Sequence, residues 1–111
     1  MIDEFTIGSF RIQGKQYLGD IKIVGGKVRY WQNRHKQTLR LQDIDQLLAG
    51  KPAIVIIGTG CSGLLRIPDD VQRMLRLARV QVIIQKTPDA CKTYNTLATE
   101  KKNIAAILQA T

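Results

Sequence analysis

The chain has 111 residues, of which 44% are hydrophobic and 23% are charged, and its formal net charge is +8. This length suits one ordinary domain, and this composition excludes a disordered chain. Apolar runs such as residues 53–57 are far too short to span a bilayer. Two cysteines without a CxxC pair exclude a disulfide scaffold and, beside a single histidine, indicate no structural metal site.

The first third of the chain predicts antiparallel β-hairpins. We expect a strand over residues 10–12 to pair with residues 16–24 across a turn at Gly14. Gly25-Gly26 is a two-residue loop that permits positive φ at both positions, so residues 27–32 should return as the next strand. Apolar and polar residues alternate along these segments, as they do in strands that are buried on one side.

The remainder predicts alternating helices and strands. In chain order we expect helix 41–48, strand 53–57, helix 68–79, buried strand 80–85, helix 88–99 with Thr87 as its N-cap, and strand 104–108. The β-α-β-α-β order predicts parallel strands joined by right-handed crossovers. We therefore predict one α/β domain over residues 1–111, a small layered domain with a mixed sheet. The N-terminal hairpins either extend that sheet or form a second layer.

A glycine-rich loop, Gly58–Gly63, reads GxGxxG and follows a predicted strand. A dinucleotide-binding loop needs its helix to open within the glycines. Here residues 64–67 intervene, and Asp69 and Asp70 at the helix start would repel an anion. The sequence therefore favours a loop that needs glycine for its backbone geometry. Its place at the carboxyl end of a parallel strand also indicates a ligand or partner cleft.

The candidate reactive groups do not add up to a complete catalytic set. Cys61 and Cys91 follow neighbouring predicted strands, so they could approach one another, and a helix start near Cys91 would lower its pKa. Cys91 also falls on the apolar helix face, which favours a small core residue. His35 could serve as a base for Cys61, but a solvated loop histidine is the simpler interpretation. The carboxylates at helix starts are explained by capping, and Asp20 by a turn.

Basic residues gather in two places. One group surrounds the loop after the third strand and forms a candidate basic contact surface: Arg29, Arg34, His35, Lys36 and Arg40. The other is an arginine stripe on the helix over 68–79, which is typical of a solvated face. Basic side chains beside Tyr30 and Trp31 could bind single-stranded nucleic acid, but these two aromatic side chains should point to opposite faces of the strand.

Several short motifs occur in order along nearly the whole chain: Gly8-Ser9-Phe10, Gly14, Tyr17, Asp20-Ile21, Tyr30-Trp31, Asp43–Leu48, Ile54–Gly60, Pro68, and Thr87-Pro-Asp-Ala-Cys-Lys-Thr-Tyr94-Asn95. The last of these is the most specific. The pattern resembles the Mth-type domain family, which includes the adipogenesis-associated Mth domain-containing protein and mitochondrial complex I assembly factor 3. The resemblance implies a three-layered α/β fold, and binding or assembly more than catalysis. The chain departs from the family at 109–111, where a family histidine is replaced.

We therefore hypothesise a non-catalytic protein-interaction or complex-assembly module without a cofactor. The resemblance implies a protein partner, with respiratory-complex subunits as candidates. The expected contact surfaces are the basic group named above and a cleft formed by Gly58, Thr59, Gly60, Cys61, Thr87, Tyr94 and Asn95. Two alternatives stay open, namely a small-molecule-binding protein or enzyme that uses the cleft, and a nucleic-acid-binding protein. The start of the chain lacks a targeting pattern, so we expect a cytoplasmic protein.

Overall fold

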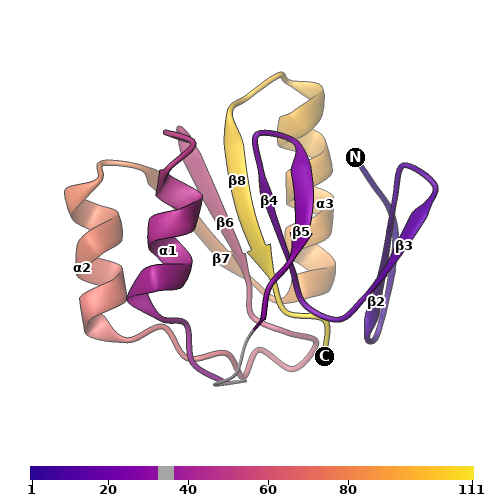
Figure 1. Cartoon of the computed structure of the whole chain (residues 1–111), viewed down its shortest axis with the longest axis horizontal. Coiled ribbons are helices and arrows are strands. Elements are labelled where there is room, and N and C mark those ends of the chain that lie inside the picture. Colours follow the sequence, from indigo (N-terminus) through magenta and orange to yellow (C-terminus); the bar gives the residue numbers. More distant parts are fainter. Residues whose placement is uncertain (33–36) are drawn as a thin grey trace.

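The structure is a computed structural model, and it describes residues 1–32 and 37–111. Eight strands and three helices are described in this part of the chain (Figure 1). Their bounds are β1 Ile2–Thr6, β2 Ser9–Ile12, β3 Lys15–Leu18, β4 Ile21–Val24, β5 Lys27–Tyr30, α1 Leu41–Leu48, β6 Ile54–Gly58, α2 Asp69–Leu77, β7 Gln81–Gln85, α3 Thr87–Thr99 and β8 Ile104–Leu108.

The main sheet has five strands in the order β5-β4-β8-β6-β7. β6 is parallel to both β7 and β8, whereas β4 is antiparallel to β5 and β8. Gly25 and Gly26 form the β4–β5 turn with φ of 58° and 76°, which confirms the predicted hairpin. The mixed α/β fold class predicted from the sequence is therefore confirmed.

The N-terminal hairpins divide between two sheets. β1, β2 and β3 form a separate three-stranded antiparallel sheet, in which Phe10 faces Tyr17. The single strand expected over residues 16–24 is wrong, because Gly19 has a φ of 114° and β3 ends before it. Beyond Asp20 the chain joins the other sheet as β4. Strand β1 was not predicted from the sequence.

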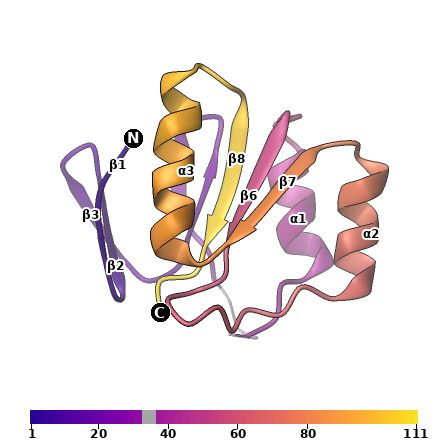
Figure 2. The same ribbon diagram turned by 180° about the vertical axis from the view of Figure 1, so that it is seen from behind.

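The five-stranded sheet lies between two layers, as both views show (Figures 1 and 2). Helices α1 and α2 cover one face, where Val55, Ile57 and Ile107 are buried. Helix α3 and the three-stranded sheet cover the other face, where Ile23 and Ile56 are buried. Because side chains alternate along a strand, the all-apolar sequences of β6 and β8 supply both cores at once.

Helix α1 matches its predicted range and illustrates how the helices are held. Ile44 and Leu47 are its buried face. Asp43 accepts two hydrogen bonds at the helix start, from the Arg40 backbone amide at 2.9 Å and from Trp31 Nε1 at 3.1 Å. One carboxylate therefore satisfies a free helix amide and orients the indole on the core below.

Strand β7 differs from its prediction. The sequence suggested that residues 80–85 are buried, but β7 is an edge of the five-stranded sheet and pairs with β6 alone. Ile84 is 50% exposed. A continuous run of β-branched residues is typical of strands covered on both faces. Here Val82 and Ile83 pack against the two cores, whereas the outer edge of β7 stays unpaired.

Candidate functional site

The carboxyl ends of β6, β7 and β8 lie side by side at one end of the sheet, as expected for parallel strands. The loop Gly58–Gly63 leaves β6 there, Thr87 follows β7, and residues 109–111 follow β8. The backbone amide of Thr87 donates to the carbonyl of Gly60 at 3.1 Å, and that of Gln109 donates to Gly58 at 3.0 Å. The three chain segments are therefore in direct contact.

Thr87 is the centre of this contact and is fully buried. Its hydroxyl donates to the backbone carbonyl of Gln109 at 2.7 Å and accepts from the backbone amide of Gly60 at 2.9 Å. The sequence predicted Thr87 as the N-cap of α3, and this is corrected, since Lys86 occupies that position. The Thr87 side chain instead joins the ends of β6 and β8 across the start of the helix.

The loop glycines are packed against the chain itself. A Cβ on Gly58 would lie 2.8 Å from Leu108 Cδ2 and 2.9 Å from Thr87 Oγ1. A Cβ on Gly60, whose φ is 94°, would lie 2.5 Å from the Thr111 carbonyl oxygen. Both positions therefore require glycine for close approach, and Gly60 also for its backbone angle. This agrees with a structural reason for the glycine-rich loop.

The segment after β8 is held from three sides. The Ala110 amide donates to the Asp20 carboxylate at 2.6 Å, and the Gly8 amide donates to the Ala110 carbonyl at 2.8 Å. The Cys61 amide donates to the Thr111 carbonyl at 3.2 Å. Asp20, for which a turn role was expected, therefore fixes the end of β8 from 90 residues away.

The Tyr94-Asn95 motif lies on α3, away from this contact. Tyr94 belongs to the core beneath the helix, and burial raises the pKa of its phenol. The Asn95 side chain forms two hydrogen bonds with the backbone of Ile2, one donated and one accepted, both at 2.8 Å. Of the predicted cleft residues, Gly58, Gly60 and Thr87 are thus brought together, whereas Asn95 attaches β1 to α3.

The two cysteines differ in environment. Cys91 is buried on α3, and desolvation, with a smaller contribution from nearby Cys61, raises the pKa of its thiol to about 12. Cys61 is half-buried in the loop. Because the pKa of the Cys91 thiol is raised, the start of α3 does not activate it, contrary to one alternative considered from the sequence.

The Thr59 hydroxyl donates a hydrogen bond to the Gln85 carbonyl at 3.1 Å and so links the loop after β6 to the end of β7.

The predicted basic contact surface is described only in part. Residues 34–36, which carry Arg34, His35 and Lys36, lie outside the described residues. Arg29 lines a groove between the β4–β5 hairpin and α1, whereas Arg40 lines a separate hollow beside Pro68 and Asp70. The structure thus places the described members of the surface on two hollows.

The groove at Arg29 is the most basic hollow described. It has a volume of about 390 Å³ and is lined by Lys22, Val24, Lys27, Arg29, Gln46 and Ala49. Lys22 and Arg29 lie directly opposite across β4 and β5, as do Val24 and Lys27. Two cations in opposite positions repel each other, and no carboxylate is among the described lining residues. An acidic group in this groove would relieve that repulsion.

Lys22 and Lys27 were not predicted as contact residues, although the sequence contains a signal for them. A two-residue turn at Gly25-Gly26 fixes the register of the hairpin, which pairs position 22 with 29 and position 24 with 27. Counting outward from the turn would have placed Lys22, Lys27 and Arg29 on one face of the sheet.

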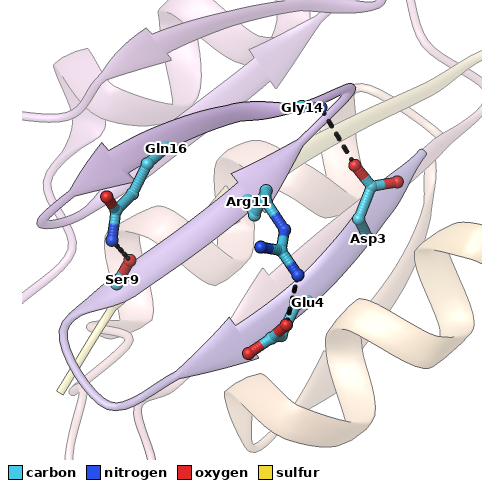
Figure 3. A network of polar contacts seen from close by, with 6 residues as sticks. All are labelled: Asp3, Glu4, Ser9, Arg11, Gly14 and Gln16. Carbon is cyan, nitrogen blue, oxygen red and sulfur yellow. Dashed lines mark hydrogen bonds and ion pairs between the residues drawn. The ribbon is translucent and has the colours of Figure 1, made fainter.

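The outer face of the three-stranded sheet is polar and bonded within itself (Figure 3). Arg11 forms an ion pair with Glu4, Gln16 Nε2 donates to Ser9 Oγ at 3.0 Å, and the Gly14 amide donates to Asp3 at 3.1 Å. Exposed pairs of this kind are typical of a solvated surface. We therefore do not assign a binding role to this face.

Among residues 1–32 and 37–111, no three His, Cys, Asp or Glu side chains lie close enough to hold a metal ion. None of the described helices combines the length and apolarity that a bilayer crossing requires.

Solved structures of several proteins share this fold. An outer membrane protein from Bartonella henselae has a TM-score of 0.87 at 27% identity, over 98% of this chain and 92% of that one. A conserved hypothetical protein from Pyrococcus horikoshii OT3 has a TM-score of 0.89 at 24% identity, over 100% and 98% of the two chains. A Mth938-like domain from Bordetella pertussis has a TM-score of 0.70 at 20% identity, over 98% and 84%. The last two show the fold alone.

The chain belongs to the family described as "Protein of unknown function (DUF498/DUF598)", whose profile matches residues 2–109. It is 29% identical over 107 residues to the "13 kDa major membrane protein" of Francisella tularensis subsp. holarctica (strain LVS), across 95% of this chain and 86% of that protein. It is also 29% identical over 109 residues to human "NADH dehydrogenase [ubiquinone] 1 alpha subcomplex assembly factor 3". That match covers 96% of this chain but only 59% of the assembly factor. The resemblance inferred from the motifs is confirmed.

Proposed function

We propose that this chain is a protein-interaction module that assists the assembly of a multi-subunit complex and carries out no catalysis itself. The observation that carries the proposal is the likeness to the assembly factors, which extends over 96% of this chain. Those proteins are named for the assembly of NADH dehydrogenase, so a respiratory-complex subunit is the partner that we propose first.

The polar groups where β6, β7 and β8 end support the non-catalytic part of the proposal. The Thr87 hydroxyl and the Thr59 hydroxyl are both used in hydrogen bonds within the chain. The thiol of Cys91 is buried and its pKa is raised to about 12, which keeps it protonated. A nucleophile and a base in mutual contact, which acyl or group transfer requires, are not among these described residues.

We propose that the partner is bound through the basic groove, together with the exposed rim of the loop after β6. The groove joins three cationic side chains to an apolar floor formed by Val24 and Ala49. Such a combination fits an acidic protein surface, because the contact is both hydrophobic and charge-complementary. The predicted cleft residues Gly58, Thr59, Gly60, Cys61 and Thr87 would then support the rim, and Arg29 would make direct contact.

The test is affinity capture of the tagged chain from its native lysate, with and without nuclease, followed by mass spectrometry and absorbance at 260 nm. A nuclease-resistant, stoichiometric protein partner is the expected result. The double variant Lys22→Glu, Arg29→Glu should lose that partner. The variant Lys92→Glu, Lys102→Glu is the matched control, because it changes the net charge equally at exposed positions outside the groove.

Other outcomes would overturn the proposal. Nuclease-sensitive absorbance with no protein partner would assign the basic residues to nucleic acid. A preparation without either partner would favour a small ligand at the loop. Equal capture by both double variants would leave a partner but remove the groove from the contact surface.

We further propose that the module acts in the cytoplasm. Two similar proteins carry the word membrane in their names, so cell fractionation should include a high-salt wash. Recovery in the supernatant before or after that wash agrees with the proposal, and recovery only after detergent extraction contradicts it.

A further inference from the structure

The edge strands of this fold differ in the way they are protected. An unpaired strand edge can pair with another chain, and charged side chains are one of the devices that prevent this. Three of the described edge strands carry such charges: β1 has Asp3 and Glu4, β3 has Lys15, and β5 has Lys27 and Arg29. The fourth, β7, reads Gln-Val-Ile-Ile-Gln and has neither a charge nor a proline.

The backbone of β7 presents free groups at regular positions. The Gln81 amide donates to the Ala53 carbonyl, and the Gln85 carbonyl accepts from the Thr59 amide. Residues 81, 83 and 85 therefore direct their backbone amides and carbonyls toward β6. The amide and carbonyl of one residue point to the same side of a strand, and successive residues alternate. Val82 and Ile84 therefore direct their amides and carbonyls outward, in a spacing that a further strand could match.

A shallow apolar groove runs beside this edge. It has a volume of about 150 Å³ and lies between α2 and β7, lined by Gln72, Leu75, Arg76, Val80, Val82 and Ile84. The side chains of Val82 and Ile84 form its floor on the sheet side. A strand added to β7 would place every second side chain over this groove. Backbone pairing would then supply affinity, and the groove would select among side chains of the added strand.

Charge indicates which kind of chain fits. Arg76 lines the groove, Arg79 lies between α2 and β7, and Lys86 follows β7 directly. The acids of α2, Asp69 and Asp70, occupy the helix start and are not among the lining residues. A segment with acidic residues at its ends would therefore be attracted at both ends of the strand.

A second copy of this chain fits less well. Antiparallel pairing of two β7 strands would place both α2 helices on the same face of the joined sheet, each with the arginines described above. Each copy also has a formal net charge of +8. Like charges across an interface oppose association, so a homodimer through this edge is disfavoured.

We propose that the outer edge of β7 and the groove beside α2 form a docking site for an extended, acidic segment of a protein partner, which binds as a sixth strand of the sheet. The proposal deepens and rests on the interaction function proposed above. This site lies at the sheet edge opposite β5 and is distinct from the basic groove at α1.

The test uses a fluorescein-labelled peptide in which valine and threonine alternate between paired glutamates, titrated with the full chain by fluorescence anisotropy. Ile84→Glu places on the edge a charge that repels the acidic peptide, and Ile84→Pro removes one outward amide without breaking a bond to β6. Both should weaken binding by about tenfold or more. Ile7→Glu is the matched control, since Ile7 is 76% exposed in the β1–β2 turn, and it should bind within about twofold of the original chain. Circular dichroism verifies that each variant is folded.

Several results would overturn the proposal: no binding of the peptide to the original chain, unchanged binding by Ile84→Pro, or equally tight binding of a peptide with lysine in place of glutamate. Self-association that Ile84→Pro abolishes would assign the edge to a second copy. Lysate capture separates the two proposals. A partner that both Ile84→Glu and Ile84→Pro retain removes the β7 site but keeps the assembly function. Absence of any partner for the original chain removes that function, and the peptide titration then still decides the β7 site.

Discussion

Replacing Thr87 tests whether its hydroxyl joins the ends of three strands. Thr87→Val keeps the shape of the side chain but removes the hydroxyl that bonds to two buried groups, the Gly60 amide and the Gln109 carbonyl. Removal of one partner from a buried hydrogen bond costs about 1–3 kcal/mol, so we expect the free energy of unfolding to fall by about 2–5 kcal/mol. Thr87→Ser keeps both hydrogen bonds and loses one buried methyl group, which costs about 1 kcal/mol.

Urea denaturation followed by circular dichroism measures both variants, and an unchanged m-value shows that only stability has changed. The relative stability of the two variants shows whether the hydroxyl or the methyl group of Thr87 is more important. If Thr87→Val is as stable as the original chain, or more stable than Thr87→Ser, the methyl group is more important than the hydroxyl. The role assigned to the two hydrogen bonds would then be refuted.

Three further perturbations test neighbouring contacts. Gly60→Ala should lower the free energy of unfolding by about 2–4 kcal/mol in urea denaturation, because its Cβ would lie 2.5 Å from a carbonyl oxygen at a φ of 94°. Gly14, with a φ of 79°, has open space around it, so the control Gly14→Ala should cost about 1 kcal/mol. Equal losses in the two variants would contradict the packing argument. The pKa of Cys91 is raised from 9.0 to about 12 in the folded chain, so the protonated thiol contributes its full stability below pH 9, and that contribution is lost as pH rises toward 12. The free energy of unfolding should therefore fall by about 1 kcal/mol between about pH 8 and 10. In Cys91→Ala this part of the pH dependence should be absent. Asn95→Ala should speed hydrogen exchange at the amide of Ile2 and lower the free energy of unfolding by about 1–3 kcal/mol. Asn95→Asp keeps the acceptor for that amide and should have a smaller effect. Unchanged exchange in Asn95→Ala would show that β1 is held by packing alone.

Local patterns in the sequence predicted most elements correctly. The spacing of Ile44 and Leu47 defines α1, and the glycine pair at 25–26 defines the β4–β5 hairpin. The bounds of β8 could also be predicted, because an apolar run enclosed by polar residues leaves little choice. In each case the relevant interactions lie within a few residues of one another.

The elements that could not be predicted depend on distant contacts. β1 has an irregular pattern, and it is a strand because β2 pairs with it and Asn95 binds Ile2 across 93 residues. The division of residues 16–24 between two sheets depends on Gly19 and on Asp20, whose carboxylate binds Ala110. A period-two pattern continues through this break, because each half buries alternate residues in the same core.

The candidate site was predicted in part for the same reason. The position of the glycine loop at the end of β6 follows from the parallel topology, and so does its nearness to Thr87. The use of Thr87 in bonds to two other segments could not be predicted, because a threonine before a proline is also a common helix cap. The exposure of β7 was missed because a hydrophobic run does not tell an edge strand from a central one.

The position of β8 has a consequence for synthesis of the chain. It is the last strand of the fold in sequence, yet it occupies the middle of the five-stranded sheet, between β4 and β6. While a ribosome translates this domain, the β4–β5 hairpin and the β6–β7 pair therefore emerge with facing, unsatisfied edges and no strand between them. The sheet can close only when residues 104–108 have left the exit tunnel. Until then the nascent chain exposes apolar strands that are prone to aggregate.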